Sequence, residues 1–157
     1  MAKIKVIFSR NTHPTDIFSY LVRLVTWSNW SHVGVITSNG TVIESTYFQG
    51  GVHECPLADF KARSTAWEIR EFEVSSIAGI ESAGRSLIGK PYNFLALFGL
   101  LFHIGSWKGT GSYFCSELVT HMFAKGGTPL FNIEYEARVS PQLIWMLPSS
   151  KVECGIN

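Results

Sequence analysis

The sequence predicts an α+β fold in which an antiparallel sheet packs against helices. Residues 32–37 and 41–45 have the apolar, β-branched composition of strands, and the Asn39-Gly40 pair between them is typical of a hairpin turn. Residues 77–88 and 115–125 instead carry apolar side chains at helical spacing. Further strand-like segments flank the hairpin, so we expect three or four antiparallel strands in sequence, packed on helices.

The length and composition indicate a single domain spanning residues 1–157, large enough to bury a core without disulfides or a metal. Hydrophobic residues make up 46% of the chain, which excludes extensive disorder. Thirteen basic and twelve acidic residues give a net charge of +1, and no basic cluster is present. Nucleic acid is therefore not an expected partner.

The three cysteines, Cys55, Cys115 and Cys154, are widely spaced and form no CxxC pair. This pattern favours free thiols in a reducing compartment. The only cluster of potential metal ligands in the sequence is His53-Glu54-Cys55, which lacks a second pair of ligands at a familiar spacing. We therefore expect no metal and no cofactor.

The first half of the chain is expected to contain strands and one helix. A strand covers residues 4–8, and Pro14-Thr15-Asp16 opens a helix with Thr15 as the N-cap. Gly50-Gly51 marks a turn before a strand near 52–54, and a polar linker after Pro56 leads to a strand within 66–74. The helix has a core-facing stripe at i, i+3, i+4, i+7 and i+8: Ile17, Tyr20, Leu21, Leu24 and Val25.

The second half is expected to be mainly helical. The apolar run 94–104 is too short to span a bilayer, so it is either a buried or an interfacial helix. The next helix runs from about Cys115 to Lys125 and stops at Gly126-Gly127, and Ser140-Pro141 caps a last short helix. Before them, a helix ending at Gly89, with Pro91 beyond it, has one face made of Ile77, Ile80, Gly84, Leu87 and Ile88.

Cys115 is the candidate nucleophile. In the first turn of its helix, unpaired backbone N–H groups and the positive end of the helix dipole favour the thiolate, which is the nucleophilic form. However, Cys115, Val119, Met122 and Phe123 also fall at helical spacing, and free cysteine is commonly buried. A simple core position is therefore the alternative.

His32 is the candidate base, and Glu44 on the paired strand is the candidate residue that orients it. If Asn39-Gly40 is a two-residue loop, Ile36 pairs with Ile43 and Glu44 faces away from His32. A three-residue loop or a bulge reverses this parity. The sequence therefore requires an odd loop if Glu44 acts with His32, and otherwise offers Ser45 or Tyr47 as partners.

Four motifs in this order resemble the circularly permuted papain-like hydrolases of the NlpC-type peptidase superfamily, a branch that includes lecithin–retinol acyltransferase-like enzymes. They are Ser31–Ile36 (SHVGVI), Val42–Ser45 (VIES), Gly89–Phe94 (GKPYNF) and Tyr113–Val119 (YFCSELV). The resemblance implies a permuted papain-like fold with Cys115 as nucleophile, His32 as base and Glu44 as third residue. It also implies a substrate site with Tyr92 near the oxyanion, flanked by the motif residues Ser31 and Ser116. Glu117 departs from the family pattern, in which the unpermuted members carry glycine.

The expected activity is that of a cysteine amidase or endopeptidase that forms a thioester with a small peptide, such as a bacterial cell-wall (peptidoglycan) peptide. A lipid or acyl-ester hydrolase or acyltransferase is the alternative, because the run 94–102 is suited to lining an acyl groove or to weak contact with a membrane surface. A non-catalytic binding or virion-structural module is the third alternative. The N-terminal residues lack the features of a secretory signal peptide, so we expect either a cytoplasmic protein or a phage-delivered or virion component.

Overall fold

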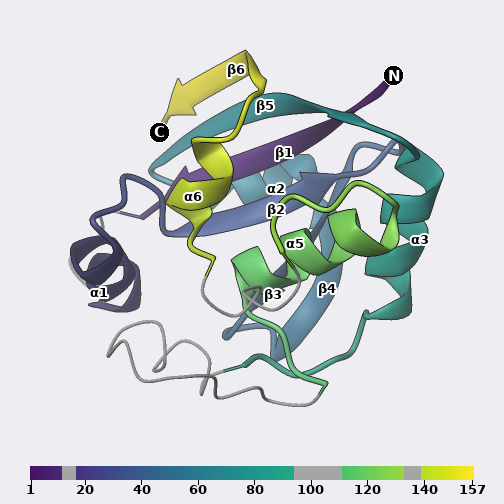
Figure 1. Cartoon of the computed structure of the whole chain (residues 1–157). Coiled ribbons are helices and arrows are strands. Elements are labelled where there is room, and N and C mark those ends of the chain that lie inside the picture. Colours follow the sequence, from purple (N-terminus) through teal and green to yellow (C-terminus); the bar gives the residue numbers. More distant parts are fainter. Residues whose placement is uncertain (12–16, 94–110, 133–138) are drawn as a thin grey trace.

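The computed structural model describes residues 1–11, 17–93, 111–132 and 139–157. Within these parts, six strands form one antiparallel sheet in the order β4-β3-β2-β1-β5-β6 (Figure 1). The N-terminal strand therefore lies inside the sheet, with β2, β3 and β4 on one side of it and β5 and β6 on the other. The strands are β1 (Ala2–Arg10), β2 (His32–Ile36), β3 (Thr41–Thr46), β4 (Gly51–Pro56), β5 (Ala66–Val74) and β6 (Ser150–Ile156).

Helices lie on both faces of this sheet (Figure 1). Those in the described parts are α1 (Ile17–Thr26), α2 (Leu57–Ala62), α3 (Ile77–Ser86), α5 (Cys115–Lys125) and α6 (Pro141–Trp145). One face is covered by α3, α5 and α6, and the opposite face by α2. None of the described helices has both the length and the apolar character needed to cross a bilayer.

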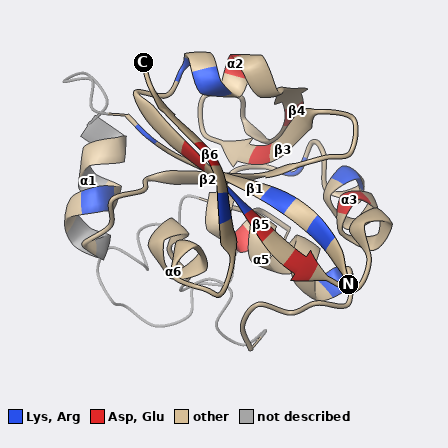
Figure 2. Ribbon diagram, turned by 90° about the horizontal axis from the view of Figure 1, so that it is seen from above, with Lys and Arg blue, Asp and Glu red and all other residues tan. Residues whose placement is uncertain are grey.

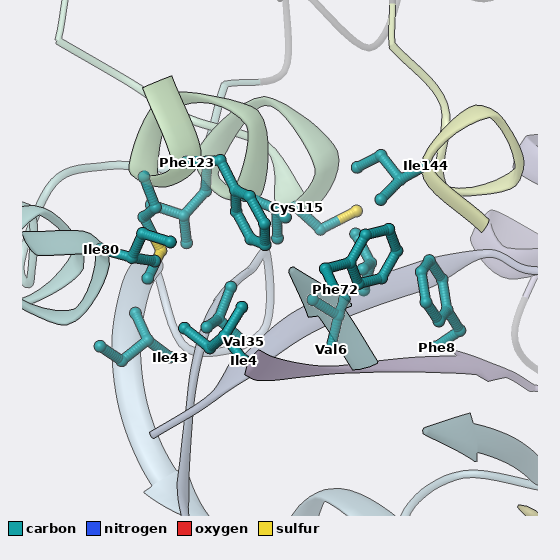
Figure 3. Close-up of a cluster of buried hydrophobic side chains, with 14 of the residues drawn as sticks. Ile4, Val6, Phe8, Val35, Ile43, Phe72, Ile80, Cys115, Phe123 and Ile144 are labelled. Carbon is teal, nitrogen blue, oxygen red and sulfur yellow. The ribbon is translucent and has the colours of Figure 1, made fainter. Parts of the chain in front are cut away.

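The two faces of the sheet carry separate clusters of buried side chains, because successive residues of a strand point to opposite sides. Val6 and Phe8 of β1 belong to the larger cluster, which packs on Ile80 of α3 and Phe123 of α5 (Figure 3). Ile7 of β1 belongs to the smaller cluster on the other face. The smaller cluster also contains Ile36, Val42, Phe60, Trp67 and Ile69.

Charged residues reinforce the pairing of β1 with β5, where basic and acidic segments lie side by side (Figure 2). Lys3 lies opposite Glu73, and Lys5 lies opposite Glu71. The Nζ atom of Lys3 is 3.9 Å from the Oε2 atom of Glu71. Opposite charges on neighbouring strands favour this register.

The expected strands and the helices near 77–88, 115–125 and 141–146 are present, and α5 has the predicted bounds. Two elements were not predicted. The short helix α2 lies in the segment taken as a polar linker, and only Phe60 of that helix is buried. The edge strand β6 is exposed along nearly its whole length, so it lacks the apolar alternation by which strands are recognised.

The predicted core-facing stripe of α1 is wrong at two positions. Tyr20 and Leu24 are 61% and 59% exposed, whereas Ser19 and Val22 are buried. The helix turns this buried side toward a cavity, and the Ser19 hydroxyl is 2.6 Å from the hydroxyl of Ser31. Periodicity identified the helix but could not reveal which side is covered. The expected N-cap Thr15 and the apolar run 94–104 lie outside the described residues.

Another correction concerns the end of α3, which closes at Ser86, earlier than the predicted stop at Gly89. Ile88, expected on the buried face of this helix, comes after its end and is exposed. Gly89 adopts a positive φ of 89° in the turn that follows. The turn carries the chain to Pro91, which forms an isolated bridge with Gly51 at the start of β4.

Candidate active site

The hairpin of β2 and β3 places His32 and Glu44 on the same face of the sheet. Val35 pairs with Ile43, so the loop between the strands has an odd number of residues. The backbone N–H of Thr37 donates to the Thr41 carbonyl at 2.8 Å, which closes a three-residue loop ending at Gly40 with a φ of 79°. The three-residue loop therefore gives the pairing in which His32 and Glu44 are able to act together.

Gly34 lies between these two side chains in the register and makes their approach possible. A Cβ atom at Gly34 would lie 2.6 Å from Cγ1 of Val42, 3.2 Å from the carbonyl oxygen of Ile43 and 3.4 Å from Cβ of Glu44. The missing side chain at Gly34 therefore leaves space for residues of the neighbouring strand β3.

The carboxylate of Glu44 is fully buried and surrounded by donors from three elements. Its Oε2 atom is 2.5 Å from Nε2 of His32 on β2. Its Oε1 atom is 3.0 Å from Nε2 of His53 and 3.2 Å from Sγ of Cys55, both on β4, and accepts a hydrogen bond from Nη2 of Arg63 after α2.

These contacts determine the charge of Glu44. Burial alone would raise the pKa of a carboxyl group. The hydrogen bonds with His32 and His53, together with the positive charges of His32 and Arg63, overcome this and hold the pKa of Glu44 well below its usual range. Glu44 is therefore an anion at neutral pH. Cys55 shows the opposite effect, because burial and the neighbouring carboxylate raise its pKa to about 12.

Cys115 occupies the first position of α5. Phe114 before it is extended, with φ −93° and ψ 171°, and serves as the N-cap residue. The carboxylate of Glu117 accepts hydrogen bonds from the backbone N–H of Phe114 and from Nδ2 of Asn93, both at 3.3 Å. Glu117 therefore caps the helix that carries the thiol, which gives its departure from the family pattern a structural role.

The thiol of Cys115 lies between the larger apolar cluster, in which Figure 3 shows it, and the cavity described below. Cys115 is 6% exposed, and its side chain is hydrogen-bonded to His32. Burial by itself would lower the pKa of His32, but the hydrogen bonds and negative charges of Cys115 and Glu44 raise it to about 9. His32 is thus the link between the buried carboxylate and the thiol.

The His32 ring is held from its other side by α2. It stacks on Phe60 with the ring centroids 5.4 Å apart and the planes at 21°. With Nε2 directed to Glu44, the second ring nitrogen, Nδ1, is left for the thiol. The imidazole is therefore restrained both by its hydrogen bond and by packing.

A cavity of about 320 Å³ opens beside these groups. Its lining comes from several elements, among them the end of β1, α1, the end of β3 with the turn that follows it, and α2 with the residues after it. Ser31 and Tyr92, both expected at the substrate site, line this cavity with His32 and Cys115. Burial, followed by the nearby Cys115 and Glu117, raises the pKa of the Tyr92 hydroxyl well above its usual value, so it remains a hydrogen-bond donor.

The structure places Ser116 elsewhere, contrary to its expected position at the substrate. Its side chain is fully buried, and Oγ donates a hydrogen bond to the Val139 carbonyl at 2.5 Å. The next residue along a helix points about 100° away from Cys115, which explains the difference. The Ser116 side chain therefore joins α5 to the segment before α6.

His53, Cys55 and Arg63 were not predicted as members of this site. The motif His53-Glu54-Cys55 did signal His53 and Cys55, and Glu44 from β3 supplies the third group that the sequence could not show. Within the described residues, the ligand atoms of Glu44, His53 and Cys55 lie within 4.8 Å of one another and form a group able to hold a metal ion. No local pattern pointed to Arg63.

Comparison with known proteins identifies the family and the fold. The family model described as permuted papain-like amidase enzyme, YaeF/YiiX, C92 family, matches residues 4–142. The crystal structure of the metalloprotein yiiX from Escherichia coli O157:H7 is similar, with a TM-score of 0.72 and 19% sequence identity over 99% of this chain and 98% of that chain. No curated protein matches the sequence. The first two findings confirm the expected permuted papain-like fold.

Proposed function

Because the chain belongs to the YaeF/YiiX family of permuted papain-like amidases, and is therefore a cysteine hydrolase, we propose that it cleaves an amide bond through a thioester on Cys115. Membership of this family confirms the enzyme class expected from the sequence. The substrate and the residues that perform the reaction are the subject of the proposal. The observation that carries it is the contact of one imidazole, His32, with both the buried carboxylate and the thiol.

In the proposed first step, His32 accepts the proton of Cys115 at Nδ1. With a pKa of about 9, the imidazolium retains this proton at neutral pH beside the thiolate. The sulfur attacks the carbonyl carbon, and the C–N bond breaks as His32 returns the proton to the leaving amine. Water, deprotonated by His32, then attacks the thioester, and the carboxylic acid leaves as the sulfur regains its proton.

Two groups are suited to stabilising the oxyanion of each step. The backbone N–H of Cys115 lies at the first position of α5, where N–H groups have no partner within the helix. The Tyr92 hydroxyl lines the same cavity and keeps its proton because of burial. Preorganised donors of this kind stabilise developing negative charge in the transition state. Among the groups that take part in the reaction, Glu44 contacts only the imidazole of His32 and therefore acts as a positioning residue.

We infer that the substrate is a small peptide. A cavity of about 320 Å³ is at the lower end of the range for small-molecule sites. Its lining includes polar side chains that match the N–H and C=O groups of a peptide, among them Asn11, Ser31, Gln49 and Ser64. The proposed substrate is a bacterial cell-wall peptide, and the protein itself is proposed to be either cytoplasmic or delivered by a phage.

The test is thiol labelling combined with turnover. Iodoacetamide at neutral pH should modify Cys115 faster than Cys55 and Cys154, as followed by peptide mass spectrometry. A panel of short peptide amides should be hydrolysed by the wild type and not by Cys115→Ala, and mass spectrometry of the quenched reaction should show an acyl group on Cys115. Equal, slow labelling of the three thiols, or unchanged turnover in Cys115→Ala, would overturn the proposal.

An acyl ester is the second candidate substrate, and one observation favours it. Tyr47 and Phe48 line the cavity and are 52% and 84% exposed, so the cavity has an apolar rim. The apolar run 94–102, on which this alternative was first based, lies outside the described residues. Hydrolysis of p-nitrophenyl esters whose rate increases with chain length, together with co-sedimentation with liposomes, would favour the ester over the peptide.

A further inference from the structure

A second cluster of reactive side chains lies on the side of Glu44 away from the catalytic thiol. In the register of β3 and β4, Glu44 lies opposite His53, and Cys55 follows two residues later on the same face. Oε1 of Glu44, Nε2 of His53 and Sγ of Cys55 all lie within 4.8 Å of one another. The proposed hydrolysis uses only Oε2 of Glu44, through His32.

The ring of His53 is oriented as a metal-binding histidine would be. Its Nδ1 atom is 3.1 Å from the carbonyl oxygen of Gly51, an arrangement in which Nδ1 carries the hydrogen and donates it. Its Nε2 atom faces Oε1 of Glu44 at 3.0 Å and donates a hydrogen bond to this carboxylate; a metal ion at this position would take the place of that hydrogen. A backbone carbonyl at the remote nitrogen is the usual way in which proteins orient a ligating imidazole.

A positive charge already occupies this cluster. Nη2 of Arg63 contacts Oε1 of Glu44 and lies 3.6 Å from Sγ of Cys55. The Arg63 side chain is 41% exposed and also lines the cavity, so it has solvent space into which to move. Two of the three donor atoms, Oε1 of Glu44 and Sγ of Cys55, therefore already contact a cation, which is carried by a long and partly exposed side chain.

We propose that Oε1 of Glu44, Nε2 of His53 and Sγ of Cys55 bind a zinc-like divalent transition metal, which takes the place of the Arg63 guanidinium. One oxygen, one nitrogen and one sulfur ligand suit Zn²⁺ or Co²⁺ and do not suit Mg²⁺ or Ca²⁺, which need oxygen ligands. Cys55 Sγ and His53 Nε2 release their protons to solvent on binding, and the carboxylate and thiolate then balance the two positive charges of the metal. Oε2 stays with His32, so metal and thiol share Glu44.

The experiment is a Co²⁺ titration of the chelator-treated full chain, followed by thiolate-to-cobalt charge-transfer absorption and by calorimetry. Wild type should bind one Co²⁺, displaceable by Zn²⁺, with the charge-transfer band. Cys55→Ser should lose the band and bind at least about tenfold more weakly. Arg63→Gln removes the guanidinium that competes with the metal, so this variant should bind Co²⁺ about tenfold more tightly than wild type. Circular dichroism establishes that each variant is folded.

Two further cysteine variants distinguish this cluster from other thiols. Cys154→Ser, on the exposed strand β6, should leave the titration unchanged. Cys115→Ser should also retain the band, and its loss would place the metal on the catalytic thiol and overturn the proposal. The proposal also fails if neither wild type nor Arg63→Gln binds Co²⁺, or if the band persists in Cys55→Ser. Because the readout is metal binding, these results do not depend on whether the proposed hydrolysis occurs.

Discussion

Replacing Glu44 by Gln tests whether the buried carboxylate supports the imidazolium of His32. The rise in the pKa of His32 from 6.5 to about 9 corresponds to about 3 kcal/mol in favour of the imidazolium. Glu44 and Cys115 each contribute one hydrogen bond and one charge interaction, and together they also offset burial. Removing the charge of Glu44 should therefore cost more than half of this, about 2 kcal/mol, which is roughly a 20-fold loss of imidazolium–thiolate pairs.

The assay is the rate of alkylation of Cys115 by iodoacetamide as a function of pH, with the site identified by mass spectrometry. At neutral pH, Glu44→Gln should react about 20-fold more slowly than wild type, following the free-energy estimate above. At strongly alkaline pH, where hydroxide in place of His32 can accept the proton, the two rates should converge. This convergence separates a charge effect from a general loss of structure.

Glu54→Gln is the matched control. Glu54 lies on β4 next to His53 but faces the other side of the sheet, where it contacts Thr41 and Arg85. It should react at the wild-type rate throughout. The reasoning is refuted if folded Glu44→Gln is alkylated at the wild-type rate near pH 7, or if it is equally slow at every pH.

Three other outcomes follow from the same structure. The pKa of Glu44 is lowered on folding, so Glu44 stabilises the fold above its unfolded pKa of 4.5 and this stabilisation is lost as the pH falls below that value. The pKa of His32 is raised on folding, so His32 stabilises the fold below pH 6.5 and this stabilisation is lost as the pH rises through about 9. Melting temperatures should therefore be highest between about pH 4.5 and 6.5, and a flat profile in wild type would contradict this. Gly34→Ala should lower the free energy of unfolding in urea by about 1–3 kcal/mol, because the new Cβ overlaps Val42; an unchanged midpoint would show that β3 yields freely. Glu117→Ala should cost about 1 kcal/mol in the same assay, because it removes the acceptor for the Phe114 N–H, whereas exposed Glu153→Ala should cost less.

The position of Glu44 shows how far local reasoning extends. The sequence identified a hairpin at Asn39-Gly40 and the two residues whose cooperation depends on it. It could not decide between two and three loop residues, although that single residue determines whether Glu44 and His32 share a face. The closing pair of Thr37 and Thr41 decides it, because its hydrogen bond sets the register for the whole of β3.

The surroundings of Glu44 depend on contacts that no local pattern encodes. Arg63 reaches the carboxylate from the end of a six-residue helix that has only one buried side chain. His53 and Cys55 were visible as an incomplete metal motif, and their third member comes from the neighbouring strand. Ser116 shows the converse error, since a place next to the nucleophile in sequence did not place its side chain in the cavity.

The sequence by itself determined the α+β class, the bounds of α5, the order of histidine strand before cysteine helix, and the identity of Cys115 and His32 as a candidate pair. The elements follow from side-chain periodicity and helix-terminal residues, which act over a few neighbouring positions, and the candidate pair follows from the residue types and the order of short motifs. The tertiary structure alone decided which side of α1 is covered, which face carries Glu44, and which donors surround it. Those outcomes depend on strand register and on packing between distant segments, where a shift of one residue reverses the face and leaves the local pattern unchanged.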